Sequence, residues 1–285
     1  LYNFCYILHS VFCIILTKPI VIYINKLYND SKIRNMGGYM DKLNNDIMHD
    51  NYSQAVKDCT ESKDKKFIPA IESVLKKKPI QMPKEMYEAS GINIFGKRIK
   101  SLIFTTDLAI IKNHNADGVI AVYPFTPQIA INQAIIEVSS APVFVGVGGG
   151  ITTGQRSIDI AINAELTGAY GVVMNAPTPN ELIFKMKERL DIPIIITIVS
   201  EKEDFESRIE AGASIFNVSG GAKTTSIVRK IREKHPYFPI IATGGPNPEN
   251  IKNTIQAGAN TITFTPPTTG ELFSEIMDNY RDKMF

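Results

Sequence analysis

The chain has 285 residues, of which 44% are hydrophobic and 21% are charged, and its formal net charge is +2. This is the profile of an ordinary globular protein with enough apolar side chains for one large domain. The near-neutral charge and the lack of a basic cluster rich in aromatic residues argue against a nucleic-acid-binding protein. Cys5, Cys13 and Cys59 have neither the spacing of a zinc site nor that of a disulfide framework. The sequence therefore favours a cytoplasmic protein and predicts no metal site.

Residues 1–39 differ from the rest of the chain, because they contain no alanine and no glutamate. Three interpretations stay open. The bias toward Ile, Tyr, Asn, Lys and Leu is typical of translated AT-rich DNA, which would make Met40 the true start and the leader non-native. Alternatively, the apolar run of residues 4–24 is a membrane anchor, although Lys18 and Pro19 interrupt it. The third interpretation is a genuine soluble extension.

Residues 40–100 are predicted to form an N-terminal helical extension, in which residues 65–80 have the periodicity of an amphipathic helix. From residue 101 onward, short apolar runs alternate with helical patterns eight times. The expected strands are residues 101–107, 118–125, 142–150, 171–177, 192–200, 214–221, 239–246 and 261–267. A last helix over residues 269–285 is expected to close the ring.

The apolar runs are continuous rather than alternating, which is typical of parallel strands covered by helices on both faces. Gly168, Gly212 and Gly258 stand just before strands, where glycine serves as a helix C-cap. The length from Met40 onward is close to the ~250 residues of one eight-stranded barrel. The sequence therefore predicts a single (β/α)8 TIM barrel over residues 101–285, with a doubly wound open sheet as the alternative α/β fold.

A late motif resembles that of a known family. Thr243, Gly244 and Gly245, followed by Asn247 at a helix start, resemble the corresponding motif of the ketodeoxyphosphogluconate aldolases, which are aldolase-type, ribulose-phosphate-binding barrels. Pro246 departs from this pattern, because that family usually has isoleucine there. The chain from about residue 65 also resembles a group of uncharacterised bacterial barrel proteins labelled "hydrolase". These resemblances imply the barrel fold and leave the chemistry open.

Missing residue types limit that chemistry. In such barrels the site lies at the carboxyl ends of the strands. None of the expected strands contains a lysine, so a class I aldolase would lack its Schiff-base residue. Metal-dependent hydrolysis needs several converging His, Asp or Glu side chains, whereas only Asp107 and Glu201 follow strands directly. His114 and His235 are expected at the opposite end of the barrel.

Three residues form the predicted catalytic set. Asp107 is a lone carboxylate at the end of an apolar strand, where it serves either as a general base or as the N-cap of the next helix. Asn175 and Asn217 lie within otherwise apolar strands, and a buried amide must find partners. These two side chains either orient a ligand carbonyl or bind each other across the barrel.

Glycine-rich loops at the same end are candidates for anion binding, because their backbone amides and the following helix N-terminus attract negative charge. Residues 219–225 form the better loop, since Pro246 and Pro248 remove donors from the loop after residue 243. Each glycine also has a purely structural interpretation as a tight turn. The residues expected to bind the ligand or its phosphate are Gly148, Gly149, Gly150, Arg156, Ser219, Gly220, Gly221, Lys223, Thr243, Gly244, Gly245 and Thr268.

Three functions follow from these patterns. We expect an enzyme that acts on a small phosphorylated or carboxylated metabolite, with lyase-like or isomerase-like proton transfer at Asp107. The alternatives are a non-catalytic barrel that binds an anion, and a barrel that holds the phosphate of FMN on its late glycines. We expect no nucleic-acid partner, and no membrane partner unless residues 1–39 are genuine. A homo-oligomer stays open.

Overall fold

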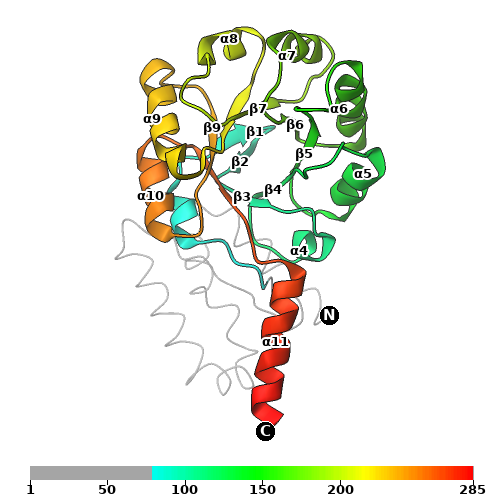
Figure 1. The fold of residues 1–285 in the computed structure, drawn as a ribbon, viewed down its shortest axis with the longest axis vertical. Coiled ribbons are helices and arrows are strands. Elements are labelled where there is room, and N and C mark those ends of the chain that lie inside the picture. Colours follow the sequence, from blue (N-terminus) through cyan, green and yellow to red (C-terminus); the bar gives the residue numbers. More distant parts are fainter. Residues whose placement is uncertain (1–78, 285) are drawn as a thin grey trace, which may run out of the picture. The chain divides into compact units, whose positions relative to one another are not determined.

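The computed structural model describes residues 79–284, so the expectations for residues 1–39 and for most of the helical extension lie outside the described residues. Eight parallel strands form a closed ring (Figure 1). They are β3 (Ser101–Phe104), β4 (Gly118–Ala121), β5 (Val143–Gly148), β6 (Gly171–Met174), β7 (Ile194–Ile198), β8 (Ile215–Val218), β9 (Ile240–Thr243) and β10 (Thr261–Phe264). Each strand pairs with the next one in sequence, and β10 pairs with β3. The structure confirms the predicted (β/α)8 barrel.

One helix follows each strand. The helices are α4 (Leu108–Lys112), α5 (Ile129–Val138), α6 (Gln155–Thr167), α7 (Asn180–Lys187), α8 (Phe205–Glu210), α9 (Thr224–Lys234), α10 (Pro248–Gln256) and α11 (Thr269–Met284). Helices α4 to α10 surround the strands in Figure 1. Outward-facing strand residues such as Ile103 and Val145 share one buried cluster with helix residues such as Ile158 and Ile227. This layer between helices and strands explains why the strands are continuously apolar.

The described end of the predicted helical extension contains a 3-10 helix and a β-hairpin instead of an α-helix. Helix η2 (Lys84–Glu88) precedes the antiparallel strands β1 (Ile92–Ile94) and β2 (Lys97–Ile99). The two-residue turn consists of Phe95 and Gly96, with φ of 48° and 80°. Positive φ at both turn residues matches the right-handed twist of a tight hairpin. Alternating apolar residues around Phe-Gly were the local signal that the sequence analysis missed.

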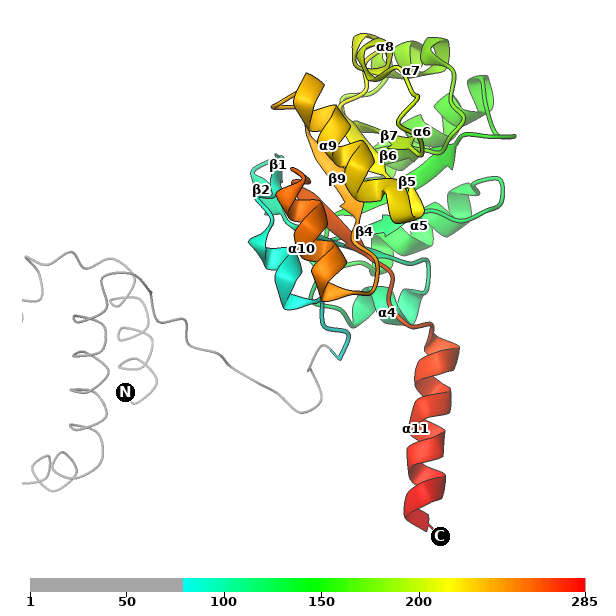
Figure 2. The same ribbon diagram turned by 60° about the vertical axis from the view of Figure 1, so that its left-hand side comes forward.

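The last helix does not close the ring, contrary to the sequence prediction. Hydrogen bonding between β10 and β3 closes it. Figure 2 shows α11 extending away from the barrel, and Phe273 and Tyr280 on this helix are 64% and 59% exposed. The segment around η2 packs against α10 instead and buries Met86 in the outer core cluster. Within residues 79–284, α11 included, the structure has no helix long and apolar enough to cross a membrane.

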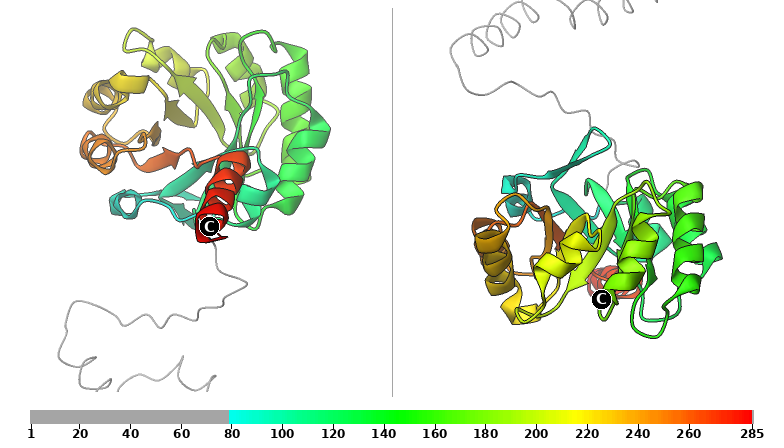
Figure 3. Two further views of the ribbon diagram at one scale, coloured as in Figure 1. Left: turned by 60° about the horizontal axis from the view of Figure 1, so that its bottom comes forward. Right: turned by 90° about the horizontal axis from the view of Figure 1, so that it is seen from above.

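One end of the barrel interior is sealed by apolar side chains. The inward-facing residues there form a single buried cluster with Ile94 and Ile99 of the hairpin, and its strand members are Leu102, Ile120, Phe144, Val173, Ile195, Ile215 and Ile241. The right-hand view of Figure 3 shows the hairpin at this end of the barrel. The hydroxyl of Thr261 donates a hydrogen bond to the carbonyl oxygen of Ile99 at 2.8 Å and fixes the hairpin. Within the described residues, the interior of the barrel can therefore admit a ligand from the carboxyl end of the strands.

Candidate functional site

At the carboxyl end of the strands, the inward-facing positions change in character. Side chains alternate along a strand, so the residues two positions after the sealed layer also face inward. On β6 to β10 these are amides and hydroxyls: Asn175, Thr197, Asn217, Thr243 and Thr263. On β3 to β5 they are Phe104, Val122 and Gly146. The mouth of the barrel therefore has a polar half and an apolar half.

The polar half holds more hydrogen-bonding atoms than the protein satisfies. Thr263 is 3% exposed, and its hydroxyl has no hydrogen-bond partner within the described residues. The Asn217 side-chain amide donates to the Thr197 hydroxyl over a long 3.4 Å. Since buried polar atoms are nearly always paired with protein or ordered water, this half of the mouth is suited to a polar ligand. Sequence analysis missed Thr197, although it stands two positions after Ile195, as Asn217 does after Ile215.

Asn175 is held by its backbone, whereas its side chain has no partner in the part of the chain that the structure describes. Its amide donates to the carbonyl of Gly148 at 2.9 Å, and a Cβ atom at Gly149 would collide with its carbonyl. The Gly149 amide donates to Thr152 at 2.8 Å, and the Gly150 amide also bonds a protein carbonyl. The amides of Gly149 and Gly150 are thus engaged by the protein. In this loop a tight turn that lets the backbone pass close to Asn175 is enough to explain why glycine is present.

Asp107 is the N-cap of α4. Its carboxylate accepts hydrogen bonds from the amides of Ala109 at 2.8 Å and Ile110 at 3.3 Å. Its second oxygen accepts a bond from the hydroxyl of Thr269, which begins α11. The hydrogen bond from Thr269 is the main cause that lowers the pKa of Asp107, and the two backbone amides add to it while partial burial opposes it. Asp107 is therefore ionised at neutral pH and is a weaker base than a free carboxylate.

The loop between β8 and α9 leaves donors available. The Gly220 amide donates to the Thr224 hydroxyl at 3.1 Å, which shapes the turn. Gly221 has a φ of 58°, and its amide has no hydrogen bond within the described residues. Ser219 and Lys223 are exposed beside it, and Lys223 forms no ion pair there. The amides of Ser219 and Lys223 also donate to protein carbonyls, so the donors left in this loop include the Gly221 amide, the Ser219 hydroxyl and the Lys223 ammonium group.

The loops after β9 and β10 offer less to an anion. The Gly244 amide donates to the carbonyl of Thr263 at 3.2 Å, and the Asn247 side chain caps α10 as the sequence predicted. The amide of Thr268 donates to the carboxylate of Glu271 at 2.7 Å, and this bond is the main cause that lowers the pKa of Glu271. An ionised carboxylate at the start of α11 repels a ligand anion. The predicted ligand-binding roles of Gly244 and Thr268 therefore face competition from the protein itself.

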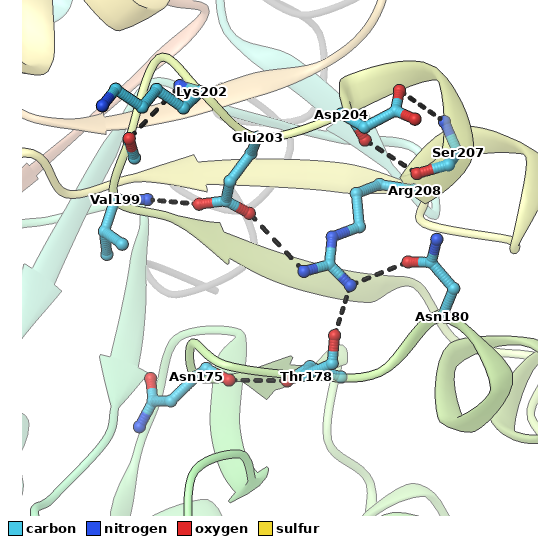
Figure 4. A network of polar contacts seen from close by, with 10 residues as sticks. Asn175, Thr178, Asn180, Val199, Lys202, Glu203, Asp204, Ser207 and Arg208 are labelled. Atoms are coloured by element: carbon cyan, nitrogen blue, oxygen red, sulfur yellow. Dashed lines mark hydrogen bonds and ion pairs between the residues drawn. The ribbon is translucent and has the colours of Figure 1, made fainter.

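Arg208 joins the loops after β6 and β7 (Figure 4). Its guanidinium donates to the carbonyl of Thr178 and, at 2.7 Å, to the side-chain oxygen of Asn180. It also pairs with Glu203 at 3.6 Å, and both side chains are 17% exposed. The Thr178 hydroxyl in turn donates to the carbonyl of Asn175 at 2.6 Å. Sequence analysis missed Arg208 because Thr178 and Asn180 lie about 30 residues away and contribute a carbonyl oxygen and an amide oxygen.

Two further predicted or alternative residues lie on the rim. Arg156, in the first turn of α6, is exposed and forms no ion pair or side-chain hydrogen bond among residues 79–284, so its charge is available. Glu201, the alternative carboxylate, accepts a bond from the hydroxyl of Ser226. Its backbone carbonyl accepts a bond from Lys230 at 2.7 Å. Glu201 therefore connects the β7 loop to α9.

A cavity of about 340 Å³ lies at the mouth of the barrel. Its lining residues come from the ends of β4, β5 and β6 and include Val122, Tyr123, Phe125, Ile151 and Asn175. A second hollow, of about 460 Å³, is lined by residues that include Arg232 and Tyr237. The Arg232 guanidinium already donates to the carbonyls of the surrounding turns, among them Gly258 at 2.7 Å. The mouth cavity is therefore the better candidate for a ligand site.

The two described histidines lie where the sequence predicts them. His114 follows α4 and His235 follows α9, so both stand before a strand, at the end opposite the mouth. His114 is buried, and its Nδ1 accepts a bond from the Ala116 amide at 3.0 Å. Among the described residues, no group of three or more His, Cys, Asp or Glu side chains is arranged to hold a metal ion.

Comparisons with known proteins bear on the fold. No family model matches the sequence, and no curated protein matches it. Among solved structures, a phosphonopyruvate hydrolase in complex with oxalate and Mg²⁺ has a TM-score of 0.53 at 12% identity, covering 67% of this chain and 85% of the other. A mandelate oxidase with benzoyl-formic acid has a TM-score of 0.51 at 14% identity, covering 62% and 68%. At these identities the similarity concerns the fold alone, and it agrees with the closed eight-stranded parallel barrel of this chain.

Proposed function

We propose that the protein is an enzyme that binds a small carboxylated or phosphorylated metabolite in the mouth of the barrel and acts on it by proton transfer. One observation carries this proposal. The hydroxyl of Thr263 is buried without a partner in the described residues, and within the same residues the side-chain oxygens of Asn217 and Thr243, beside the same opening, form no hydrogen bond. Leaving such groups unpaired is destabilising, so their placement favours a polar ligand over a purely structural role.

The acidic group of the metabolite is assigned to the loop between β8 and α9. Lys223 and the Gly221 amide are free there, and they lie at the N-terminal end of α9, where the helix dipole favours an anion. The loop after β10 is a poorer place for the acidic group, because the carboxylate of Glu271 repels an anion there. Arg156 is another exposed cation on the rim and is assigned a supporting role.

Proton transfer is assigned to Asp107, with the amides of Asn175 and Asn217 polarising a substrate carbonyl. A general base must be ionised, and the lowered pKa of Asp107 ensures this at neutral pH. The same lowering weakens the base, which favours a substrate whose C–H bond is activated by a neighbouring carbonyl. Neutral amide donors stabilise the negative charge that develops on such a carbonyl oxygen.

A flavin-dependent reaction is the weaker alternative. The phosphate of FMN would have to bind the late glycines, and the residues there do not fit it well. Pro246 and Pro248 lack amide donors, the Gly244 amide is engaged, and Glu271 places a negative charge at the next helix start. No step is therefore assigned to a flavin. A yellow protein that loses its colour when Gly245 is replaced by valine would reverse this ranking.

Titration calorimetry with inorganic phosphate and with oxalate tests the anion site. Lys223→Ala and Gly221→Ala should each weaken binding about tenfold, because one removes a charge and the other strains the donor loop. Two matched controls should bind as wild type does. Lys252→Ala removes an exposed lysine on α10, and Gly245→Ala introduces a side chain at a similar φ of 69° with equally open surroundings. Equal affinity in all four variants would refute the assignment of the anion to this loop.

Asp107→Asn tests the chemistry on any substrate that a metabolite screen identifies. Asparagine is as good an N-cap as aspartate, so the melting temperature should stay within a few degrees of wild type. A general base contributes about 10²–10⁴ in rate, so turnover should fall by at least this lower factor. Full turnover in the variant would remove Asp107 from the catalytic set and leave Glu201 as the remaining carboxylate that follows a strand.

A further inference from the structure

Large apolar side chains form one side of the mouth cavity. We define the apolar lip as Val122, Pro124, Phe125, Pro127 and Ile151, which come from the loops after β4 and β5 and line the cavity. Phe125 is 74% exposed and Ile151 is 92% exposed, so water covers most of both side chains. Exposed apolar side chains that gather beside a cavity are typical of binding sites, whereas isolated ones are ordinary. In the lip they line a cavity at the carboxyl end of the strands.

Hydrogen bonds hold the two loops of the lip together. The hydroxyl of Thr152 donates to that of Thr126 at 3.1 Å and joins the loop after β5 to the loop after β4. The hydroxyl of Ser157 on α6 donates to the carbonyl of Thr152 at 2.9 Å. The Gly149 amide donates to the same carbonyl at 2.8 Å. The lip is thus formed before any ligand arrives, which reduces the entropy lost on binding.

The polar atoms in this cavity are few and uncharged. The Tyr123 oxygen accepts a bond from the Gln128 amide at 2.7 Å, which leaves its own hydrogen available to a ligand. The Asn175 side chain supplies one more donor and one more acceptor. No Lys, Arg, Asp or Glu side chain belongs to the described lining of this cavity. A ligand group that fills it is therefore mainly apolar and uncharged, and it can carry a hydrogen-bonding atom such as a carbonyl oxygen.

We infer that the metabolite is amphipathic, with a branched aliphatic or aromatic group that packs against the apolar lip while its acidic head lies toward β8. The position of the head rests on the proposed function, whereas the apolar group rests on the lip alone. The volume of about 340 Å³ is within the range of sites for small organic molecules. Short hydrophilic sugar phosphates are disfavoured as ligands, because they would leave the apolar side chains of the lip exposed to water.

Two ligand series test this inference in the full-length protein: unbranched carboxylates from acetate to octanoate, and the corresponding neutral amides. Burial of one methylene group strengthens binding about fourfold, so affinity for wild type should rise steeply with chain length until the lip is filled. Phe125→Ser and Ile151→Ser should each reduce this rise to about twofold per methylene. Both side chains are exposed, so neither substitution should lower the melting temperature. Tyr237→Ser is the matched control, since Tyr237 is 96% exposed and lines the other hollow.

The outcomes separate this inference from the proposed function. A rise with chain length in carboxylates that both lip variants reduce, and Tyr237→Ser does not, supports the inference. If amides bind as tightly as carboxylates and show the same variant dependence, the lip is supported and the acidic head of the proposed function is refuted. Three outcomes overturn the role of the lip. These are an affinity that does not depend on chain length, an increase of affinity with chain length that the lip variants leave unchanged, and no binding in either series. If affinity is independent of chain length but Lys223→Ala weakens the binding of acetate, the lip is refuted and the proposed function is still supported.

Discussion

The two ends of the barrel interior are built from the same strands and have opposite chemistry. On β7, β8 and β9, an isoleucine faces the sealed end, and the next inward-facing residue toward the mouth is threonine or asparagine. The isoleucines are nearly inaccessible to water, whereas Asn217 and Thr243 are only half-buried. At the sealed end the side chains are closely packed and the hydroxyl of Thr261 is hydrogen-bonded, whereas at the mouth the hydroxyl of Thr263 has no partner in the described residues. We therefore expect stability to depend mainly on the sealed end and ligand binding on the mouth, as is usual for this fold.

The largest effect on stability is expected from Phe144→Ala at the sealed end. The Phe144 ring lies against Gly118 and Gly171, so that it fills space which two neighbouring strands leave empty. Truncation to alanine should lower the free energy of unfolding by about 3–5 kcal/mol, because the backbone around the ring cannot collapse into the cavity. Urea unfolding monitored by circular dichroism measures this. A loss below about 1 kcal/mol would show that the sealed end does not carry the stability.

A smaller effect is expected from the contacts that shape the mouth. Arg208→Met removes the hydrogen bonds to Thr178 and Asn180 and leaves the carboxylate of Glu203 unpaired, so it should cost about 2 kcal/mol in unfolding free energy. Glu203→Gln should cost less, since a neutral amide can keep the bond from the Val199 amide. The side-chain amide resonance of Asn175 should shift in Arg208→Met. We expect this shift because Arg208 bonds Thr178, whose hydroxyl bonds the carbonyl of Asn175, and an unmoved resonance would show that these bonds do not position Asn175.

Two threonines on β10 give the sharpest comparison of the two ends. Thr261→Val removes the hydrogen bond to the Ile99 carbonyl at the sealed end and should cost about 1–2 kcal/mol. Thr263→Val removes no bond to the described protein, so the free energy of unfolding should change by less than about 0.5 kcal/mol. Anion binding should weaken only in Thr263→Val. Equal losses of stability in the two variants would remove the distinction between a sealed end and a binding end.

The smallest effect concerns the N-cap of α4 and depends on pH. Asp107→Ala should cost about 1 kcal/mol near neutral pH, because two amides lose their acceptor. The pKa of Asp107 is lower in the folded state than in the unfolded chain. The stabilisation by its charge is therefore complete above the unfolded value of about 3.9 and is lost as the pH falls through the folded pKa. The difference between Asp107→Ala and wild type should thus shrink at acidic pH, and Asp107→Asn is the control that retains the cap.

The local elements of the barrel were readable from the sequence because short-range forces specify them. Asp107 and Asn247 cap the helices that follow them, and Gly168 ends α6 in the left-handed conformation. The continuous apolar runs became the eight strands, and their carboxyl ends gave the correct end of the barrel for Asn175 and Asn217. The hairpin over residues 92–99 was missed, although its turn is local, because Phe95 is an uncommon residue at positive φ.

The tertiary structure decided which residues far apart in the chain come into contact. Sequence periodicity alone determined that the chain forms eight strand and helix units, since alternation and capping act within a few residues. Ring closure then decided which hydroxyls meet in the mouth, which amides of the glycine-rich loops are already engaged, and that Arg208 reaches the loop after β6. It also decided that the segment around η2, instead of α11, covers the wall beside α10. Each of these depends on contacts between residues far apart in the chain, which no local pattern records.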